Sequence, residues 1–180
     1  MGLSEEHKQL VYTIKELCRV CYTCVRECPA KAIKIVNGQA EVLTERCIGC
    51  GNCIKVCSQD AKVFLLTRLE VKTLLQSKEK VAAIVAPSFP AEFTEISDYK
   101  IFVGMMRALG FDYVFEVGFG ADLVAGEYKK LLENFQEKTY ISSDCPSIVN
   151  YIKFYHPDLV EYLAPVASPM VAISRVVKKK

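Results

Sequence analysis

The chain has 180 residues, of which 51% are hydrophobic and 24% are charged, and its formal net charge is +2. This composition can bury a core, and a charge so close to balance does not indicate nucleic acid as a main partner. No apolar run approaches the about 18 residues of a membrane-spanning helix, and the first residues contain no apolar signal core, so we expect a cytoplasmic protein without a membrane span.

The first part of the chain contains signals for two helices and a hairpin. Ser4 can cap a first helix over residues 5–17, which has apolar residues on one face. Asn37-Gly38 in the middle of residues 33–43 predicts a type I′ β-hairpin. A Thr-x-x-Glu capping box then predicts a connecting helix over residues 67–80.

The second part of the chain alternates between apolar runs and helical patterns. Strands are expected at residues 81–86, 113–117 and 140–142, and helices at 99–109, 122–135 and 147–155. This alternation is typical of parallel βαβ units and predicts a small parallel sheet. Gly118-x-Gly120 lacks the third glycine of a dinucleotide-binding loop, so it does not favour a nucleotide site.

Eight of the nine cysteines form two copies of the spacing C-x2-C-x2-C-x3-C. This spacing is the run of bacterial two-cluster ferredoxins, in which the fourth cysteine of each run ligates the other cluster. The sequence therefore predicts two 4Fe–4S clusters. The expected ligands of the first cluster are Cys18, Cys21, Cys24 and Cys57. The expected ligands of the second cluster are Cys47, Cys50, Cys53 and Cys28.

Two zinc sites are the alternative interpretation of these cysteines. Structural zinc motifs usually contain two C-x2-C pairs separated by a long spacer, whereas each run here is a triplet followed by a fourth cysteine. Charge also favours clusters, because residues 1–80 contain 13 Lys and Arg against 9 Asp and Glu. This positive surplus nearly cancels two clusters that each carry a charge of about −2 with their thiolates.

Four stretches of the second part resemble the start of the catalytic domain of iron-only hydrogenases. They are, in order, Ala86-Pro87-Ser88, then GFDYVF at 110–115, then GADL at 120–123, then Cys145-Pro146 followed by HPDL at 156–159 and SP at 168–169. Each stretch is weak alone, but their order and approximate spacing match that family. Together with the cysteine repeat, the resemblance covers nearly the whole chain.

The resemblance implies a domain that binds the H-cluster, a 4Fe–4S cubane bridged by a cysteine to a di-iron centre. Cys145 matches the first of four cubane ligands, and Ala86, Pro87 and Ser88 match a loop that packs against the di-iron centre. Asp144 stands where productive enzymes have a proton-relaying cysteine. It is therefore a candidate proton relay, with a helix N-cap as the alternative.

These features define the expected organisation. We expect an α+β ferredoxin-like two-cluster domain at 1–64, a linker helix at 65–80, and a partial α/β domain with a parallel sheet at 81–180. Ala164 stands where the same proton route has a serine. The loss of this serine and of the cysteine at position 144 resembles the pattern of the sensory branch of the family.

The expected function is electron transfer in the N-terminal part of an iron-only hydrogenase, which interconverts dihydrogen with protons and electrons. The chain supplies one of the four cubane cysteines, so we expect no hydrogenase activity from it alone. It is either a fragment of a longer protein or a naturally short, non-catalytic two-cluster carrier or redox sensor. Its expected partner is a redox protein or the remaining hydrogenase domain, and a homodimer is compatible with the exposed sheet edges.

Overall fold

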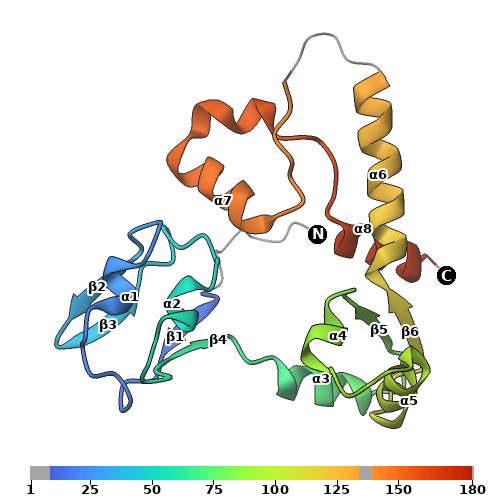
Figure 1. The fold of residues 1–180 in the computed structure, drawn as a ribbon, viewed down its shortest axis with the longest axis horizontal. Helices are drawn as coiled ribbons and strands as arrows, with labels where there is room; N and C mark the ends of the chain where they lie inside the picture. Colours follow the sequence, from blue (N-terminus) through green and yellow to red (C-terminus); the bar gives the residue numbers. More distant parts are fainter. Residues whose placement is uncertain (1–8, 134–138, 180) are drawn as a thin grey trace. The chain divides into compact units, whose positions relative to one another are not determined.

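The structure is a computed structural model that describes residues 9–133 and 139–179 (Figure 1). The described residues form two compact units, of which the first contains residues 9–66 and Cys145–Leu163 and the second contains the others. The fold is mixed α/β, and the sheets found among the described residues are pairs of strands. No described helix is long and apolar enough to cross a membrane.

The first unit joins the beginning and the end of its cysteine-rich segment in one small sheet. Strand β1 (Val11–Thr13) pairs antiparallel with β4 (Lys62–Phe64), with Thr13 opposite Lys62. The helix predicted over residues 5–17 is wrong for its described part. Its apolar residues do recur at helical spacing, but the backbone of Val11–Thr13 instead bonds to β4, and Val11 is almost completely buried. Residues 5–8 of that prediction lie outside the described residues.

The predicted hairpin of the first unit is confirmed. Strand β2 (Ile33–Val36) pairs antiparallel with β3 (Gln39–Val42). The two turn residues, Asn37 and Gly38, have φ angles of +47° and +70°. Positive φ at both central positions is the requirement of a type I′ turn, which Asn-Gly meets with little strain.

A later segment of the chain packs against this unit. Helix α7 (Pro146–Tyr155) confirms the helix expected at 147–155, and the 3-10 helix η1 (Pro157–Tyr162) follows it. The Tyr155 hydroxyl lies 2.5 Å from the carbonyl oxygen of Ala30 and 3.0 Å from that of Arg46, and its single O–H is shared between these two acceptors. The segment therefore belongs to the first unit by its contacts. The expected domain limits stay a prediction.

The second unit contains the parallel strand pair that the sequence predicts. Strand β5 (Ala82–Val85) pairs in register with β6 (Tyr113–Glu116). The connection between them carries a one-turn helix, α4 (Phe89–Glu92), and the expected helix α5 (Tyr99–Ala108), which Asp98 caps through a bond from the Lys100 amide. The parallel sheet predicted for residues 81–180 is thus present, but it is small.

The third predicted strand is wrong. Residues 140–142 form no strand, and the Ala164 amide donates a single bond of 2.9 Å to the Ile141 carbonyl. One isolated bridge does not extend a sheet, and three apolar-rich residues are too few to specify one.

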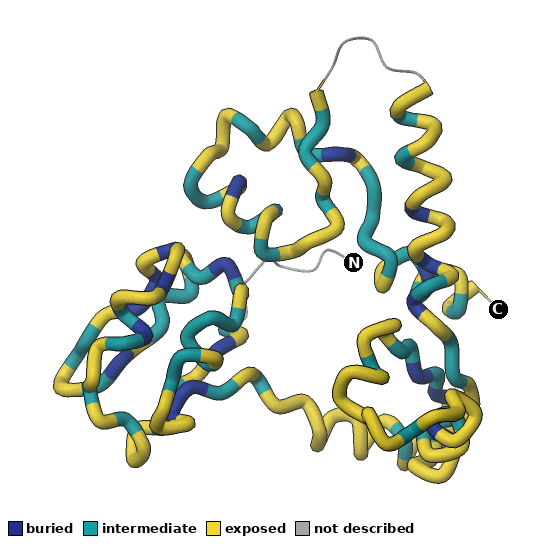
Figure 2. The backbone as a smooth tube through the Cα atoms, viewed as in Figure 1, coloured by how far each residue is buried: buried dark blue, intermediate teal, exposed yellow. Residues whose placement is uncertain are grey.

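The connecting helix is shorter than predicted. Helix α3 (Arg68–Leu75) ends five residues before Lys80, and its N-cap, Thr67, makes no side-chain capping bond, so the capping box does not form. Figure 2 shows that α3 is exposed along almost its whole length. Helices in proteins are stabilised mainly by packing of a buried face, and α3 has no such face. We therefore expect it to be short.

The long helix α6 (Val117–Glu133) begins directly after β6, five residues earlier than predicted, and residues 134 and 135 of the prediction lie outside the described residues. It packs against α8 (Pro169–Lys178), a helix that the sequence analysis does not predict. A Cβ atom at Gly120 would lie 2.1 Å from the Pro169 carbonyl oxygen. The glycine therefore serves close helix packing, which explains why it interrupts an otherwise apolar helix start.

Gly120→Ala should lower the free energy of unfolding by about 1–3 kcal/mol, because the added methyl group forces α6 away from α8. Urea titration of the variant measures this loss. The matched control is Gly126→Ala on the same helix, where a Cβ meets nothing within 4 Å. That change should stabilise the protein by about 0.5–1 kcal/mol. Equal effects at the two positions would contradict the packing argument.

Tyr155→Phe should loosen α7, because the backbone carbonyls of Ala30 and Arg46 lose the one O–H that they share, at a cost of about 0.5–1.5 kcal/mol. Hydrogen exchange measured by mass spectrometry should show faster exchange of the α7 amides. Tyr151→Phe is the control, since its hydroxyl makes one long contact of 3.4 Å with His156. Unchanged exchange in Tyr155→Phe would show that the hydroxyl does not hold the helix.

Candidate metal centres

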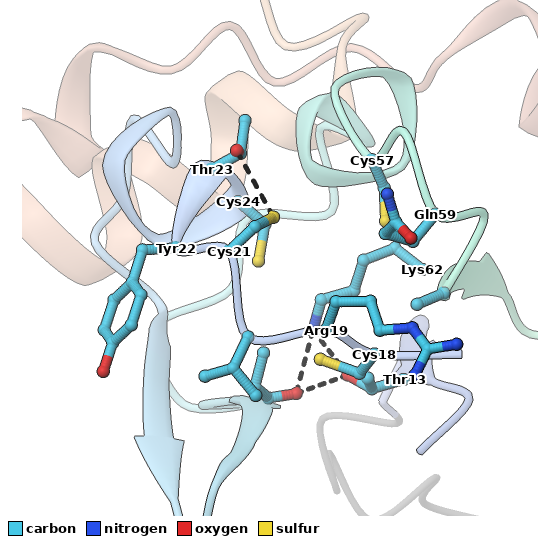
Figure 3. A pocket seen from close by; sticks show the side chains of 13 residues that line it. Thr13, Cys18, Arg19, Cys21, Tyr22, Thr23, Cys24, Cys57, Gln59 and Lys62 are labelled. Atoms are coloured by element: carbon cyan, nitrogen blue, oxygen red, sulfur yellow. Dashed lines mark hydrogen bonds between the residues drawn. The ribbon is translucent and has the colours of Figure 1, made fainter. Parts of the chain in front are cut away.

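The first unit contains a cavity lined by four of the predicted ligands. The cysteines around it are Cys18, Cys21, Cys24 and Cys57. The cavity is partly open to solvent. Figure 3 shows the first three cysteines on the loop and short helix that follow β1, with Cys57 reaching the same space from the other run. We call this space the first cavity.

A second cavity is lined by the other four predicted ligands, which are Cys28, Cys47, Cys50 and Cys53. Most of its remaining lining is apolar, including Val11, Ile33 and Ile48. The fourth cysteine of each run thus faces the cavity of the other run. This is the grouping expected from the spacing, although the assignment of these cysteines as ligands stays a prediction.

Short helices place the cysteines in both cavities. Helix α1 (Thr23–Arg26) carries Cys24, and α2 (Asn52–Lys55) carries Cys53 at the matching position. The residue before each helix is left-handed: Tyr22 has φ +64° and Gly51 has φ +76°. The chain therefore turns sharply after the second cysteine of each run, and the third cysteine returns toward the same cavity.

The first loop adopts this conformation without glycine. Val20 has φ +54°, and its counterpart in the second run, Gly49, has φ +71°. A left-handed backbone at a non-glycine residue costs roughly 1–2 kcal/mol, and most for a β-branched side chain. Such strain persists where the surrounding structure requires it, often at ligand sites. The equal conformation in both loops therefore indicates that the cysteines, rather than the loop sequence, determine this geometry.

Burial and hydrogen bonding shift the pKa values of the cysteine thiols in opposite directions. Burial raises the pKa of Cys53 to about 11 and also raises the pKa of Cys24. The hydrogen bond with the Thr23 hydroxyl, 3.4 Å from the Cys21 sulfur, lowers the pKa of that exposed thiol. Metal binding needs thiolates, so the buried cysteines must lose protons when a metal centre assembles.

The cavities suit a cluster better than a single ion. Among residues 9–133 and 139–179, no three or more His, Cys, Asp or Glu side chains lie close enough to hold one metal ion. Four cysteines line each cavity, and a single zinc ion would need all four sulfurs of one cavity at about 2.3 Å. The thiol donors of both cavities and the apolar lining of the second suit an iron–sulfur cluster.

The residues of the H-cluster-type site lie in two different units. Cys145 is an exposed residue of the first unit, at the N-cap of α7. Ala86, Pro87 and Ser88 form the exposed turn between β5 and α4 in the second unit, where Ser88 is the N-cap of α4. Their roles stay a prediction from the resemblance.

Asp144 is not the helix N-cap, because Cys145 holds that position. The Asp144 carboxylate instead accepts hydrogen bonds from the Ser142 hydroxyl at 3.1 Å and the Tyr128 hydroxyl at 3.4 Å. Sequence reasoning missed Tyr128, which lies on a helix 16 residues away and belongs to no motif. The capping alternative is therefore wrong, and proton relay stays a prediction.

Sequence reasoning also missed Lys62 of β4. Its side chain is 3% exposed, and it lines the first cavity together with the cysteines. A single lysine in a short strand gives no signal of burial, because lysine is almost always a surface residue.

Comparison with known proteins finds two family matches along the chain. Residues 79–180 match the family of iron-only hydrogenase large subunit, C-terminal domain, and residues 10–58 match the 4Fe-4S dicluster domain. The cytosolic Fe-S cluster assembly factor NAR1 of Yarrowia lipolytica is 28% identical over 154 residues, which cover 78% of this chain and 31% of that protein. Iron hydrogenase 1 of Clostridium pasteurianum is 33% identical over 112 residues, which cover 55% of this chain and 19% of that protein.

The fold agrees with these matches. A solved structure from a study of oxygen inactivation of FeFe-hydrogenase is 26% identical, with a TM-score of 0.51 over 59% of this chain and 31% of that one. The chain spans less than a third of the length of the relatives named here. With more than half of its residues in the hydrogenase match and a dicluster match before it, this chain belongs to the iron-only hydrogenase large-subunit family and is an iron–sulfur protein.

Proposed function

We propose that this chain is the electron-transfer part of an iron-only hydrogenase-related protein of the cytoplasm and holds two 4Fe–4S clusters in a ferredoxin-type module. The observation that carries the proposal is the exchange of fourth cysteines. Each cavity is lined by three cysteines of one run and the last cysteine of the other. Two-cluster ferredoxins hold their clusters with this pattern of ligands.

The residues of the chain have distinct tasks in this function. The cysteines of the first cavity would hold one cluster, and those of the second cavity the other. A bound 4Fe–4S cluster supplies a site that gains and loses one electron. The Ala32 amide donates to the Cys28 sulfur at 3.3 Å, and such bonds to a ligating thiolate raise the reduction potential. The apolar lining of the second cavity limits the access of water.

The module also has a structural link between its two runs. The Asn52 side chain, at the start of α2, donates to the Glu27 carbonyl at the end of α1 with a distance of 2.7 Å. This bond fixes the two cysteine-bearing helices relative to each other. A fixed separation of the cavities favours electron exchange between the centres that they would hold.

The hydrogenase chemistry itself needs more cysteines than this chain provides. Cys145 is the one cysteine outside the two runs, and the resemblance gives the H-cluster cubane four cysteine ligands. We therefore place the dihydrogen reaction in a larger assembly, with a redox protein or the remaining hydrogenase domain as partner. The chain alone would pass electrons.

A non-catalytic role is the second candidate function, either as an electron carrier or sensor or in iron–sulfur cluster assembly. A carboxylate at Asp144 and the buried methyl group of Ala164 replace the proton-carrying groups that the resemblance leads us to expect. The relative from Yarrowia lipolytica is an assembly factor by name. In this role the α/β half would serve as a binding surface.

Iron counting after anaerobic reconstitution tests the two-cluster proposal. We expect about eight irons and eight sulfides for each chain, at four of each in every 4Fe–4S cluster. Cys145→Ser should keep them all. A protein that retains zinc alone would contradict the proposal.

Paired substitutions test the exchanged ligands. Cys18→Ser and Cys57→Ser should each remove or weaken the same cluster, so the double variant should lose no more than about four irons. Cys53→Ser combined with Cys57→Ser should instead affect both clusters. The opposite result would contradict the exchange. If Cys53→Ser with Cys57→Ser removes only one cluster and Cys18→Ser with Cys57→Ser affects both, each run holds its own cluster.

Hydrogenase assays test the division of labour. With reduced viologen as donor and synthetic di-iron cofactor added, the reconstituted 180-residue chain should evolve no dihydrogen, because three of the four cubane cysteines are missing. The same preparation should still oxidise and reduce its clusters, which is followed by visible absorbance. Sustained dihydrogen evolution would contradict the assignment.

A further inference from the structure

The first unit contains one buried charge. Lys62 is 3% exposed, and no other charged side chain among the described residues is buried. Lysine is almost never fully buried unless it is paired with an opposite charge. This position therefore needs a compensating interaction.

The direct contacts of the Lys62 ammonium are with neutral groups. Its nitrogen donates to the Thr13 hydroxyl at 2.5 Å and to the Ala40 carbonyl at 3.1 Å. The Thr13 hydroxyl in turn donates to the same carbonyl (Figure 3). These bonds hold the ammonium in place, but they supply dipoles and no negative charge. In the part of the chain that the structure describes, no carboxylate forms an ion pair with Lys62.

A negatively charged group in the first cavity would lie beside this lysine. Lys62 lines the first cavity with its four cysteines (Figure 3). The lysine therefore borders the first cavity, and it is not among the residues that line the second.

We propose that Lys62 is a positioning residue for electron transfer, a fixed buried cation that raises the reduction potential of the cluster in the first cavity. This inference rests on the proposed function, because it requires a cluster there. In the reaction, the oxidised cluster accepts one electron from a low-potential redox protein, and no covalent bond forms or breaks. The cluster with its thiolates changes from a charge of about −2 to about −3. A nearby cation in a low-dielectric site stabilises the more negative form.

Redox titration of the reconstituted 180-residue protein, followed by electron paramagnetic resonance, tests the inference. The variants are Lys62→Met and Lys62→Gln, which remove the charge, and Lys62→Arg, which keeps it. The control is Lys55→Met, which removes a lysine located between two cysteines of the second run but exposed to solvent. Iron content is measured for every variant.

We expect each neutral variant to keep about eight irons. One of its two clusters should be reduced only at a more negative midpoint potential. The reduced fraction at a fixed potential should fall at least tenfold relative to the oxidised fraction, which is 59 mV for a one-electron couple. Lys62→Arg should stay closer to the unchanged protein, and Lys55→Met should shift less than either neutral variant, because solvent screens its charge.

Three results would overturn the inference. Neutral variants with full iron content and midpoints no lower than that of Lys55→Met would show that the buried charge does not set the potential. A loss of the cluster from both neutral variants would mean that Lys62 builds the site instead of tuning it. A shift as large in Lys62→Arg would show that shape, rather than charge, matters. Absence of clusters from the unchanged protein would contradict the proposed function, a separate failure that iron counting identifies.

Discussion

The first unit is organised around thiols instead of large apolar side chains. Its buried cluster contains three alanines, two cysteines and only two large apolar residues, and the members are Cys24, Cys28, Ala30, Ala32, Ile33, Ala40 and Ile48. Alanine and cysteine bury little apolar area, so at about 25 cal/mol per Å² this core contributes modestly to stability. Clusters that tie distant cysteines together would supply what the core lacks, because metal binding of this kind is also folding free energy. The strained loop at Val20 and the raised thiol pKa values both follow from gathering the sulfurs inside.

The cysteine spacing carries most of what can be predicted about the candidate site. Which cysteine faces which cavity follows from the pattern of two interlocked runs, and the Asn-Gly hairpin follows from local turn chemistry. Both signals are local, or repeat at fixed offsets, so a single sequence contains them. Lys62 and Tyr155 are different. Their burial and bonds come from segments far apart in the chain, and nothing in the residues beside them indicates it.

The errors in secondary structure have the same origin. Val11 lies inside the helix predicted over residues 5–17, but it joins a strand whose partner lies about fifty residues later. The start of α6 contains two glycines, which argue against a helix locally, and Gly120 is there because α8 approaches so closely. Tertiary pairing overrides local preference at both positions. The parallel pair β5 and β6 was predictable because continuous apolar runs between helices specify it without knowledge of distant partners.

The return of Cys145–Leu163 to the first unit has a consequence for the order in which the protein is made. The contact of Tyr155 with Arg46 spans 109 residues, and nearly all of the second unit's strands and helices are encoded between them. During synthesis, the cysteine runs emerge first and can fold early, but their unit stays incomplete until α7 has been translated. The second unit likewise waits for α8. The two units are interleaved along the chain, so neither can finish folding before most of the other has been synthesised.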